Sequence, residues 1–152
     1  MSICAIVPIK HNSERVPGKN YRDFNGQPLF HVILKTLLQC KDISKVVVDT
    51  NSSVVKDSIN THFCLDKIQI YDRPLHLHSG DTPTNVLLEN VITELKLDNQ
   101  VTFELKDFRD VKGKYDYITS IGAWEHFLKR NYLTALRKIY DIMNDKGVCV
   151  LH

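Results

Sequence analysis

Short runs of β-branched residues alternate with amphipathic stretches along the chain, and this alternation limits the possible folds more than any other feature of the sequence. Strands that are each followed by a helix form βαβ units, in which helical crossovers join parallel strands. The pattern therefore predicts an α/β fold. We expect a Rossmann-like, three-layer arrangement with a parallel sheet and helices on both of its faces.

The hydrophobic periodicity also places the individual elements. Predicted strands occupy residues 3–8, 45–50, 67–71, 101–106, 115–121 and 148–151. Predicted helices occupy residues 28–40, 53–62, 82–97 and 132–143, and in the third a hydroxyl N-cap, Thr82, precedes a proline. A polar turn at residues 97–100 divides the chain into halves 1–98 and 99–152, which we expect to pack in one body. Gly147 is expected to take a positive φ in the turn before the last strand.

Composition excludes several classes of protein. The apolar fraction of 43% in 152 residues supports a folded core rather than a disordered chain. The net charge of +2 is dispersed without a block of basic residues, so nucleic acid is not an expected partner. No apolar run approaches the roughly 20 residues of a transmembrane helix, and we expect a cytoplasmic protein. The four cysteines form no C-x-x-C pair and are expected to be buried free thiols.

A polar loop directly after the first predicted strand carries the strongest functional signal. Its candidate ligand-binding residues are Lys10, Ser13, Arg15, Gly18, Lys19 and Asn20. Such a loop lies at the carboxyl edge of a parallel sheet, where ligands bind. The cations can neutralise a triphosphate, while the hydroxyl and the backbone amides around the glycine can donate hydrogen bonds to it. A solvated basic loop is the alternative, since short cationic motifs occur often by chance.

The spacing P-x-K-x-x-S-x-R-x-P-G-K-N in this loop resembles the signature of acylneuraminate and related sugar-acid cytidylyltransferases, and the resemblance covers residues 3–95. It implies a protein that binds CTP, with Mg²⁺, for transfer of CMP to a sugar acid. The positions of Lys10, Ser13 and Lys19 imply contact with the triphosphate, and Arg73 is implied to lie near the nucleotide. We assign the catalytic role to Lys19 and Arg15. The family usually has arginine at position 10, and lysine keeps the charge without the bidentate fork.

After Leu97 the sequence has no counterpart of the family's later segment, which supplies acidic metal ligands and contacts to the sugar. We therefore expect nucleotide binding with incomplete catalysis. The sequence does not assign the metal ligands. Asp49 and Asp81 are partial candidates for Mg²⁺, but each is also explained as a turn or helix-flanking aspartate.

The C-terminal half resembles a different family, the S-adenosylmethionine (SAM) methyltransferases that make cyclopropane fatty acids. The resemblance rests on residues 101–110, 115–126 and 150–152. It implies that Asp107 lies near the adenine of SAM and that Glu125 and His152 form a bicarbonate site. A methyltransferase also needs a glycine-rich loop after its first strand, and none precedes Val101 in that family's form. A methyltransferase fragment and a non-catalytic fusion relic are thus the alternatives to a cytidylyltransferase.

Overall fold

The computed structural model describes residues 3–13, 16–97, 101–102, 104, 106–120 and 124–151, apart from the side chain of Glu125. The chain divides into two compact units, an N-terminal unit (Met1–Phe103) and a C-terminal unit (Glu104–His152). Each unit is described by itself. The expected division of function at residue 98 and the packing of both halves in one body stay predictions.

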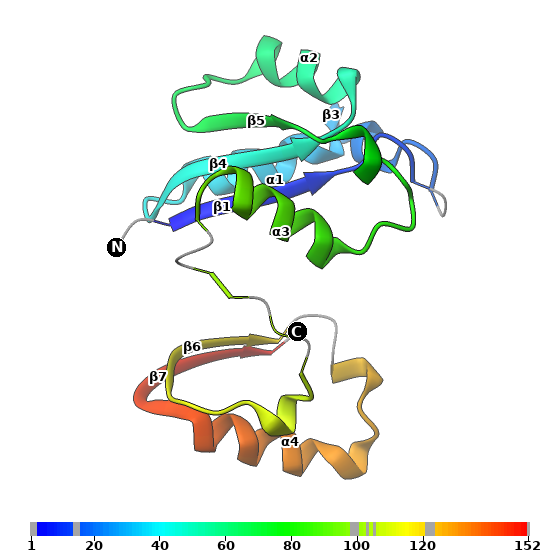
Figure 1. The fold of residues 1–152 in the computed structure, drawn as a ribbon. Coiled ribbons are helices and arrows are strands. Elements are labelled where there is room, and N and C mark those ends of the chain that lie inside the picture. The colour runs from blue at the N-terminus through cyan, green and yellow to red at the C-terminus, as the bar shows by residue number, and fades with distance from the viewer. Residues whose placement is uncertain are drawn as a thin grey trace. The chain divides into compact units, whose positions relative to one another are not determined.

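The N-terminal unit is built on a three-stranded parallel sheet with strand order β1-β4-β5. Its strands are β1 (Ile3–Ile9), β4 (Ile43–Thr50) and β5 (Ile68–Asp72). Its helices are α1 (Leu29–Gln39), α2 (Ser53–His62) and α3 (Thr84–Glu94). Helices α1 and α3 lie on opposite sides of the sheet (Figure 1). The predicted α/β fold with a parallel sheet is confirmed, and the sheet has helices on both faces.

The core of this unit lies between the sheet and helices α1 and α2. Leu34 of α1 and Ile59 of α2 are fully buried in one cluster with Val46 and Val48 of β4. Side chains alternate across a strand, so Val47 points to the other face, where it is also fully buried. Strand β4 is buried on both faces because it is the central strand, which explains its continuous apolar run.

Helix α3 begins later and ends earlier than its sequence predicts. Pro83 takes the N-cap position with an extended ψ of 144°, so the helix starts at Thr84 and no side chain caps it. The predicted hydroxyl cap from Thr82 is therefore wrong. Lys96 adopts a positive φ of 57°, a left-handed conformation that does not continue a right-handed helix. The Tyr71 hydroxyl of β5 donates to Asn90 Oδ1 of α3 at 2.7 Å, and burial raises the pKa of Tyr71, which keeps the phenol neutral.

A short hairpin joins the polar loop to α1. Strands β2 (Asp23–Phe24) and β3 (Gln27–Pro28) pair antiparallel. Asn25 and Gly26 between them have φ values of 54° and 79°, as a two-residue type I′ turn requires. This hairpin sets the direction in which α1 leaves the loop.

The C-terminal unit contains one βαβ motif. Its elements are β6 (Tyr115–Ser120), α4 (Lys129–Ile142) and β7 (Met143–Leu151), with single 3₁₀ turns at Phe108–Asp110 and Trp124–His126. Strands β6 and β7 pair parallel in a sheet of their own. The predicted strand at residues 101–106 is wrong at its described positions, which are exposed and take no strand conformation. Alternating apolar residues favour a strand only where a partner strand pairs with them.

Two further expectations are corrected. Gly147 lies within β7 rather than in a turn, and it does not have a positive φ. The register between β6 and β7 shifts between Tyr115 and Tyr117, so residues 144–147 form an irregular extension of the strand. Cys4, Cys40 and Cys64 are exposed and Cys149 is half-buried, because they lie on outer faces or at element ends. In the part of the chain that is described, no helix has the length and apolar character to cross a bilayer.

Candidate functional site

The polar loop and the segment before α3 enclose a pocket at the carboxyl end of β1. The pocket has a volume of about 590 Å³. It is lined by Pro8, Lys10, Asn12, Ser13, Lys19, Asn20, Gly80, Asp81, Thr84 and Leu87. Four of the residues singled out in the sequence, Lys10, Ser13, Lys19 and Asn20, are thus brought together around one cavity. This is the edge of a parallel sheet at which ligands of α/β proteins bind.

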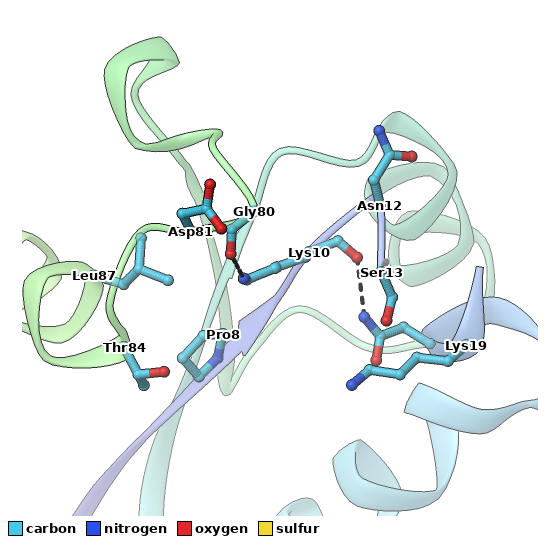
Figure 2. A pocket seen from close by; sticks show the side chains of 10 residues that line it. Pro8, Lys10, Asn12, Ser13, Lys19, Gly80, Asp81, Thr84 and Leu87 are labelled. Carbon is cyan, nitrogen blue, oxygen red and sulfur yellow. Dashed lines mark hydrogen bonds between the residues drawn. The ribbon is translucent and has the colours of Figure 1, made fainter. Parts of the chain in front are cut away.

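The backbone around Gly18 directs Lys19 toward the pocket. Gly18 has a left-handed φ of 65° and precedes the 3₁₀ turn η1 (Lys19–Tyr21). A Cβ at Gly18 would come within 2.8 Å of the Tyr21 ring, so a side chain is excluded by space as well as by φ. The amides of Tyr21 and Arg22 both donate to the Gly18 carbonyl at 3.1 Å. In Figure 2 the Lys19 side chain extends from this turn with its ammonium directed toward Pro8.

Lys10 connects the two sides of the pocket. Its ammonium donates a hydrogen bond to the Gly80 carbonyl in the segment before α3, and Figure 2 shows this contact. The carbonyl of Lys10 accepts a hydrogen bond from Asn20 Nδ2 at 2.9 Å. One residue therefore links the end of β1 to η1 and to the segment before α3. The exposed Lys19 has no such side-chain contact among the described residues and remains the cation available to a ligand.

Arg73 lies outside the pocket lining. Its side chain is buried and forms a bidentate ion pair with Asp49, with Nη2–Oδ2 at 2.7 Å and Nε–Oδ1 at 3.0 Å. Its amide donates to the Thr50 carbonyl at 3.1 Å. Arg73 and Asp49 thus join the carboxyl ends of β5 and β4. Contact of Arg73 with a nucleotide stays a prediction, and Asp49 lies in a strand rather than in the expected turn or helix-flanking position.

Among the described residues that line the pocket, the exposed Asp81 is the one with a carboxylate. Among the residues that the structure describes, no three His, Cys, Asp or Glu side chains gather into a group that could hold a metal ion. Mg²⁺ at nucleotide sites is commonly held by one or two carboxylates together with phosphate oxygens and water. The donor set therefore fits a cation held chiefly by a phosphate ligand, with Asp81 as its protein partner.

Of the remaining predicted residues, the structure describes the side chain of Asp107. Arg15 and His152, and the side chain of Glu125, lie outside the described residues. Asp107 is exposed and caps a 3₁₀ turn, where Arg109 donates to both of its carboxylate oxygens, at 2.9 and 2.6 Å. These hydrogen bonds lower the pKa of Asp107 to about 2. Asp107 is ionised and paired, and its proposed contact with adenine stays a prediction.

A second cavity, of about 440 Å³, lies within the C-terminal unit. Its lining is largely apolar and aromatic and includes Phe108, Ile118, Trp124, Phe127 and Ile139. Trp124 Nε1 is buried there without a hydrogen-bond partner among the described residues. Asp107 is not part of the lining. The two units therefore differ in kind, with a polar, cationic pocket in one and an apolar cavity in the other.

Sequence reasoning missed the far wall of the first pocket. Gly80, Thr84 and Leu87 belong to a segment that is about 70 residues from the loop, and nothing local in their sequence indicates a ligand site. Asn12 could have been found, because in an extended segment it falls on the same side of the chain as Lys10. For Gly80, Thr84 and Leu87, the one guide was a general rule of α/β sheets. Ligands bind beyond the carboxyl ends of the strands, at the point where the strand order reverses.

Comparison with known proteins finds two different families, one for the N-terminal part of the chain and one for the C-terminal part. Residues 4–105 match the family described as Cytidylyltransferase, and residues 84–152 match the family described as Mycolic acid cyclopropane synthetase. The two matched ranges overlap across α3.

Three curated relatives illustrate these matches. The CMP-N,N'-diacetyllegionaminic acid synthase of Legionella pneumophila is 37% identical over 57 residues, which are 38% of this chain and 25% of that protein. The 3-deoxy-manno-octulosonate cytidylyltransferase of Pseudoalteromonas translucida is 33% identical over 100 residues, 65% of this chain and 36% of that protein. The cyclopropane-fatty-acyl-phospholipid synthase of Escherichia coli K12 is 35% identical over 52 residues, 34% of this chain and 14% of that protein. The chain thus spans about a third or less of each of these relatives.

Proposed function

The chain belongs to the cytidylyltransferase family through residues 4–105, and from this we propose that its N-terminal unit binds CTP in the pocket at the carboxyl end of β1. The observation that carries the proposal is the convergence of Lys10, Ser13, Lys19 and Asn20 on that one cavity of about 590 Å³. The volume falls within the usual range for small-molecule sites, roughly 300–1,000 Å³. The lining combines cations with amide and hydroxyl donors, which suits a polyphosphate.

Each residue has a distinct task in the proposed complex. Lys19 supplies an ammonium with no other described side-chain contact for the phosphates, and Lys10, which also donates to the Gly80 carbonyl, adds a second positive charge beside them. Ser13 and Asn20 line the cavity with polar groups that can donate to phosphate oxygens. The positive φ of Gly18 forms the turn from which the Lys19 side chain projects. Mg²⁺, when bound with the nucleotide, would neutralise phosphate charge, and Asp81 is the carboxylate that would hold it.

We extend the proposal to the reaction class of the relatives, transfer of CMP to a sugar acid. Two of them are a legionaminic acid synthase and an octulosonate cytidylyltransferase, and both names denote activation of a sugar acid with a cytidine nucleotide. In such a transfer, negative charge builds on the departing pyrophosphate, and Lys19 and Arg15 are the groups we assign to stabilise it.

A second proposal concerns the C-terminal unit, which we propose is a methyltransferase-like fragment without a working SAM site. It is supported by the match of residues 84–152 to the cyclopropane synthetase family. The carboxylate of Asp107 is already paired with Arg109, and Asp107 does not line the cavity of this unit, whose lining is largely apolar and aromatic.

Calorimetric titration of CTP, at fixed salt and Mg²⁺, tests the main proposal. A charge-assisted contact contributes about 1.5–3 kcal/mol, so Lys19→Ala should weaken CTP binding by roughly 10- to 100-fold. Lys41→Ala is the matched control, because Lys41 is exposed in the turn between α1 and β4, at the opposite end of β4 from the site. Equal affinities for the wild type and Lys19→Ala would refute the site, and no CTP binding by the wild type would refute the function.

A further inference from the structure

His11 lies in the polar loop but faces away from the pocket. Its neighbours Lys10 and Asn12 both line the cavity, whereas His11 does not. Its amide donates to Asn51 Oδ1 at 2.9 Å, and its Nδ1 shares a hydrogen bond of 2.8 Å with Ser52 Oγ. Both partners follow β4 directly, at the start of α2. One residue therefore ties the loop to the sheet edge through its backbone and through its side chain.

The partners of His11 are themselves held in place. Ser52 is fully buried and is the N-cap of α2, where its Oγ accepts from the Val55 amide at 3.3 Å. Its own amide donates to Thr50 Oγ1 at 3.1 Å. A buried cap that is bonded on both sides is a fixed reference point, because moving it would leave buried polar groups unpaired.

His11 also reaches the part of the loop that carries Lys19. Its ring lies against Tyr21, with ring centroids 5.6 Å apart and planes 30° apart. Tyr21 is the last residue of η1 and its ring occupies the space beside Gly18. The contacts thus run from the start of α2 through His11 and Tyr21 to the turn that orients Lys19.

We propose that His11 is a positioning residue for nucleotide binding, which holds residues 10–13 and 16–22 of the loop against the start of α2 so that Lys10 and Lys19 face the pocket. The inference rests on the proposed function for its effect on CTP, and it predicts a loop conformation even without ligand. The hydrogen bond between Nδ1 and Ser52 is the contact that depends on the histidine side chain, because the amide bond to Asn51 is available to any residue at position 11 except proline.

Two substitutions of the full chain separate the hydrogen bond from the ring. His11→Asn keeps a polar atom near the position of Nδ1 and loses the ring, whereas His11→Phe keeps the ring and loses the hydrogen bond. His126→Phe, at an exposed histidine of the C-terminal unit, is the matched control. The first readout is hydrogen exchange of the amides of residues 16–22 without ligand, and the second is CTP affinity at fixed salt and Mg²⁺.

His11→Phe should speed exchange in residues 16–22 and weaken CTP binding by about 5- to 10-fold, the usual worth of one hydrogen bond, and it should lower the thermal midpoint because the buried Ser52 hydroxyl loses a partner. His11→Asn should restore both readouts to near the wild-type values. Unchanged exchange and affinity in His11→Phe, or equal losses in both variants accompanied by a lower thermal midpoint, would overturn the inference. If the wild type binds no CTP, the proposed function fails, while the exchange measurement still decides the role of His11.

Discussion

Strands β4 and β7 illustrate how differently the two units use similar sequence. In β4 five consecutive residues, Val46 to Thr50, are buried, whereas no residue of β7 is fully buried. Strand β4 has a strand on each side and helices over both faces. Among the described residues, strand β7 pairs with β6 alone, and its apolar residues Val148 and Val150 are exposed. Apolar, β-branched composition predicts a strand in both cases, but its burial depends on the neighbours that each unit provides.

This difference in burial between β4 and β7 is the reason that we place the proposed function in the N-terminal unit. A binding site needs residues that a rigid framework holds in place. The pocket of the N-terminal unit lies at the carboxyl end of β1, in a sheet that has helices on both faces. In the C-terminal unit, Ala135 is the one apolar residue fully buried among those described. Tyr117 is 74% exposed beside Val148, its partner in the register. With so few buried side chains, the C-terminal unit holds catalytic side chains less firmly in place than the N-terminal unit does.

The largest effect we predict is on the stability of the N-terminal unit. Arg73→Ala leaves the buried carboxylate of Asp49 without its partner, and removing one member of a buried ion pair costs about 3–5 kcal/mol. The free energy of unfolding, measured by urea denaturation and far-UV circular dichroism, should fall by that amount. The double variant Arg73→Met with Asp49→Leu should recover much of the loss, since no buried charge remains. A loss below about 1 kcal/mol for Arg73→Ala would contradict the structural role of the pair.

The same denaturation tests whether the halves pack in one body. Trp124, the single tryptophan, lies in the C-terminal unit, so its fluorescence reports on that unit alone. Circular dichroism reports on helices of both units. Our sequence-based expectation of one body predicts coincident transitions for the two signals. Separate midpoints would show two units that unfold independently.

A matched pair of leucines sharpens the contrast between the units. Leu34 of α1 is fully buried, whereas Leu136 of α4 is 46% exposed. Leu34→Ala should cost about 2–5 kcal/mol through lost burial and a cavity. Leu136→Ala should stay within roughly 0.5 kcal/mol, as is usual for surface positions. Similar losses for the two variants in chemical denaturation would mean that the face of α4 is buried in solution.

A smaller effect concerns pH. Burial, with His62 and Lys35 nearby, lowers the pKa of His31 from its ordinary value of 6.5. The unfolded chain therefore binds a proton more readily than the folded one, so stability is lost as pH falls through 6.5 toward the lowered value. His31→Gln, which cannot titrate, should show a shallower loss of stability over this range. Its amide keeps a polar group near Ser58 Oγ, the partner of His31 Nε2 at 2.8 Å. Parallel pH profiles would refute this contribution.

The last prediction is that added SAM produces no binding signal. Without a glycine-rich cofactor loop, and with Asp107 paired to Arg109, the chain should not bind SAM at micromolar concentration. Calorimetric titration measures this directly. Saturable binding that is lost in Asp107→Ala would contradict this prediction. It would favour the alternative that the C-terminal unit has a SAM site.

The sequence predicted local features well and distant ones poorly. The helix at residues 53–62 was predicted from its apolar spacing and has the observed bounds, and in the structure Ser52 caps its start. The contact of Lys10 with Gly80 and the pair of Asp49 with Arg73 could not be predicted, because each joins segments that only the folded sheet brings together. The turn expected at Gly147 failed for a related reason, since pairing with β6 extends β7 through it.

We assign the nucleotide site to the N-terminal unit, and hydrogen exchange of the full chain with and without CTP and Mg²⁺ decides this assignment. Bound nucleotide should slow exchange at residues 16–22 and 79–84, the two sides of the pocket, and leave residues 106–120 and 124–151 unchanged. Unchanged exchange at both sides of the pocket, or protection confined to the C-terminal unit, would contradict the assignment.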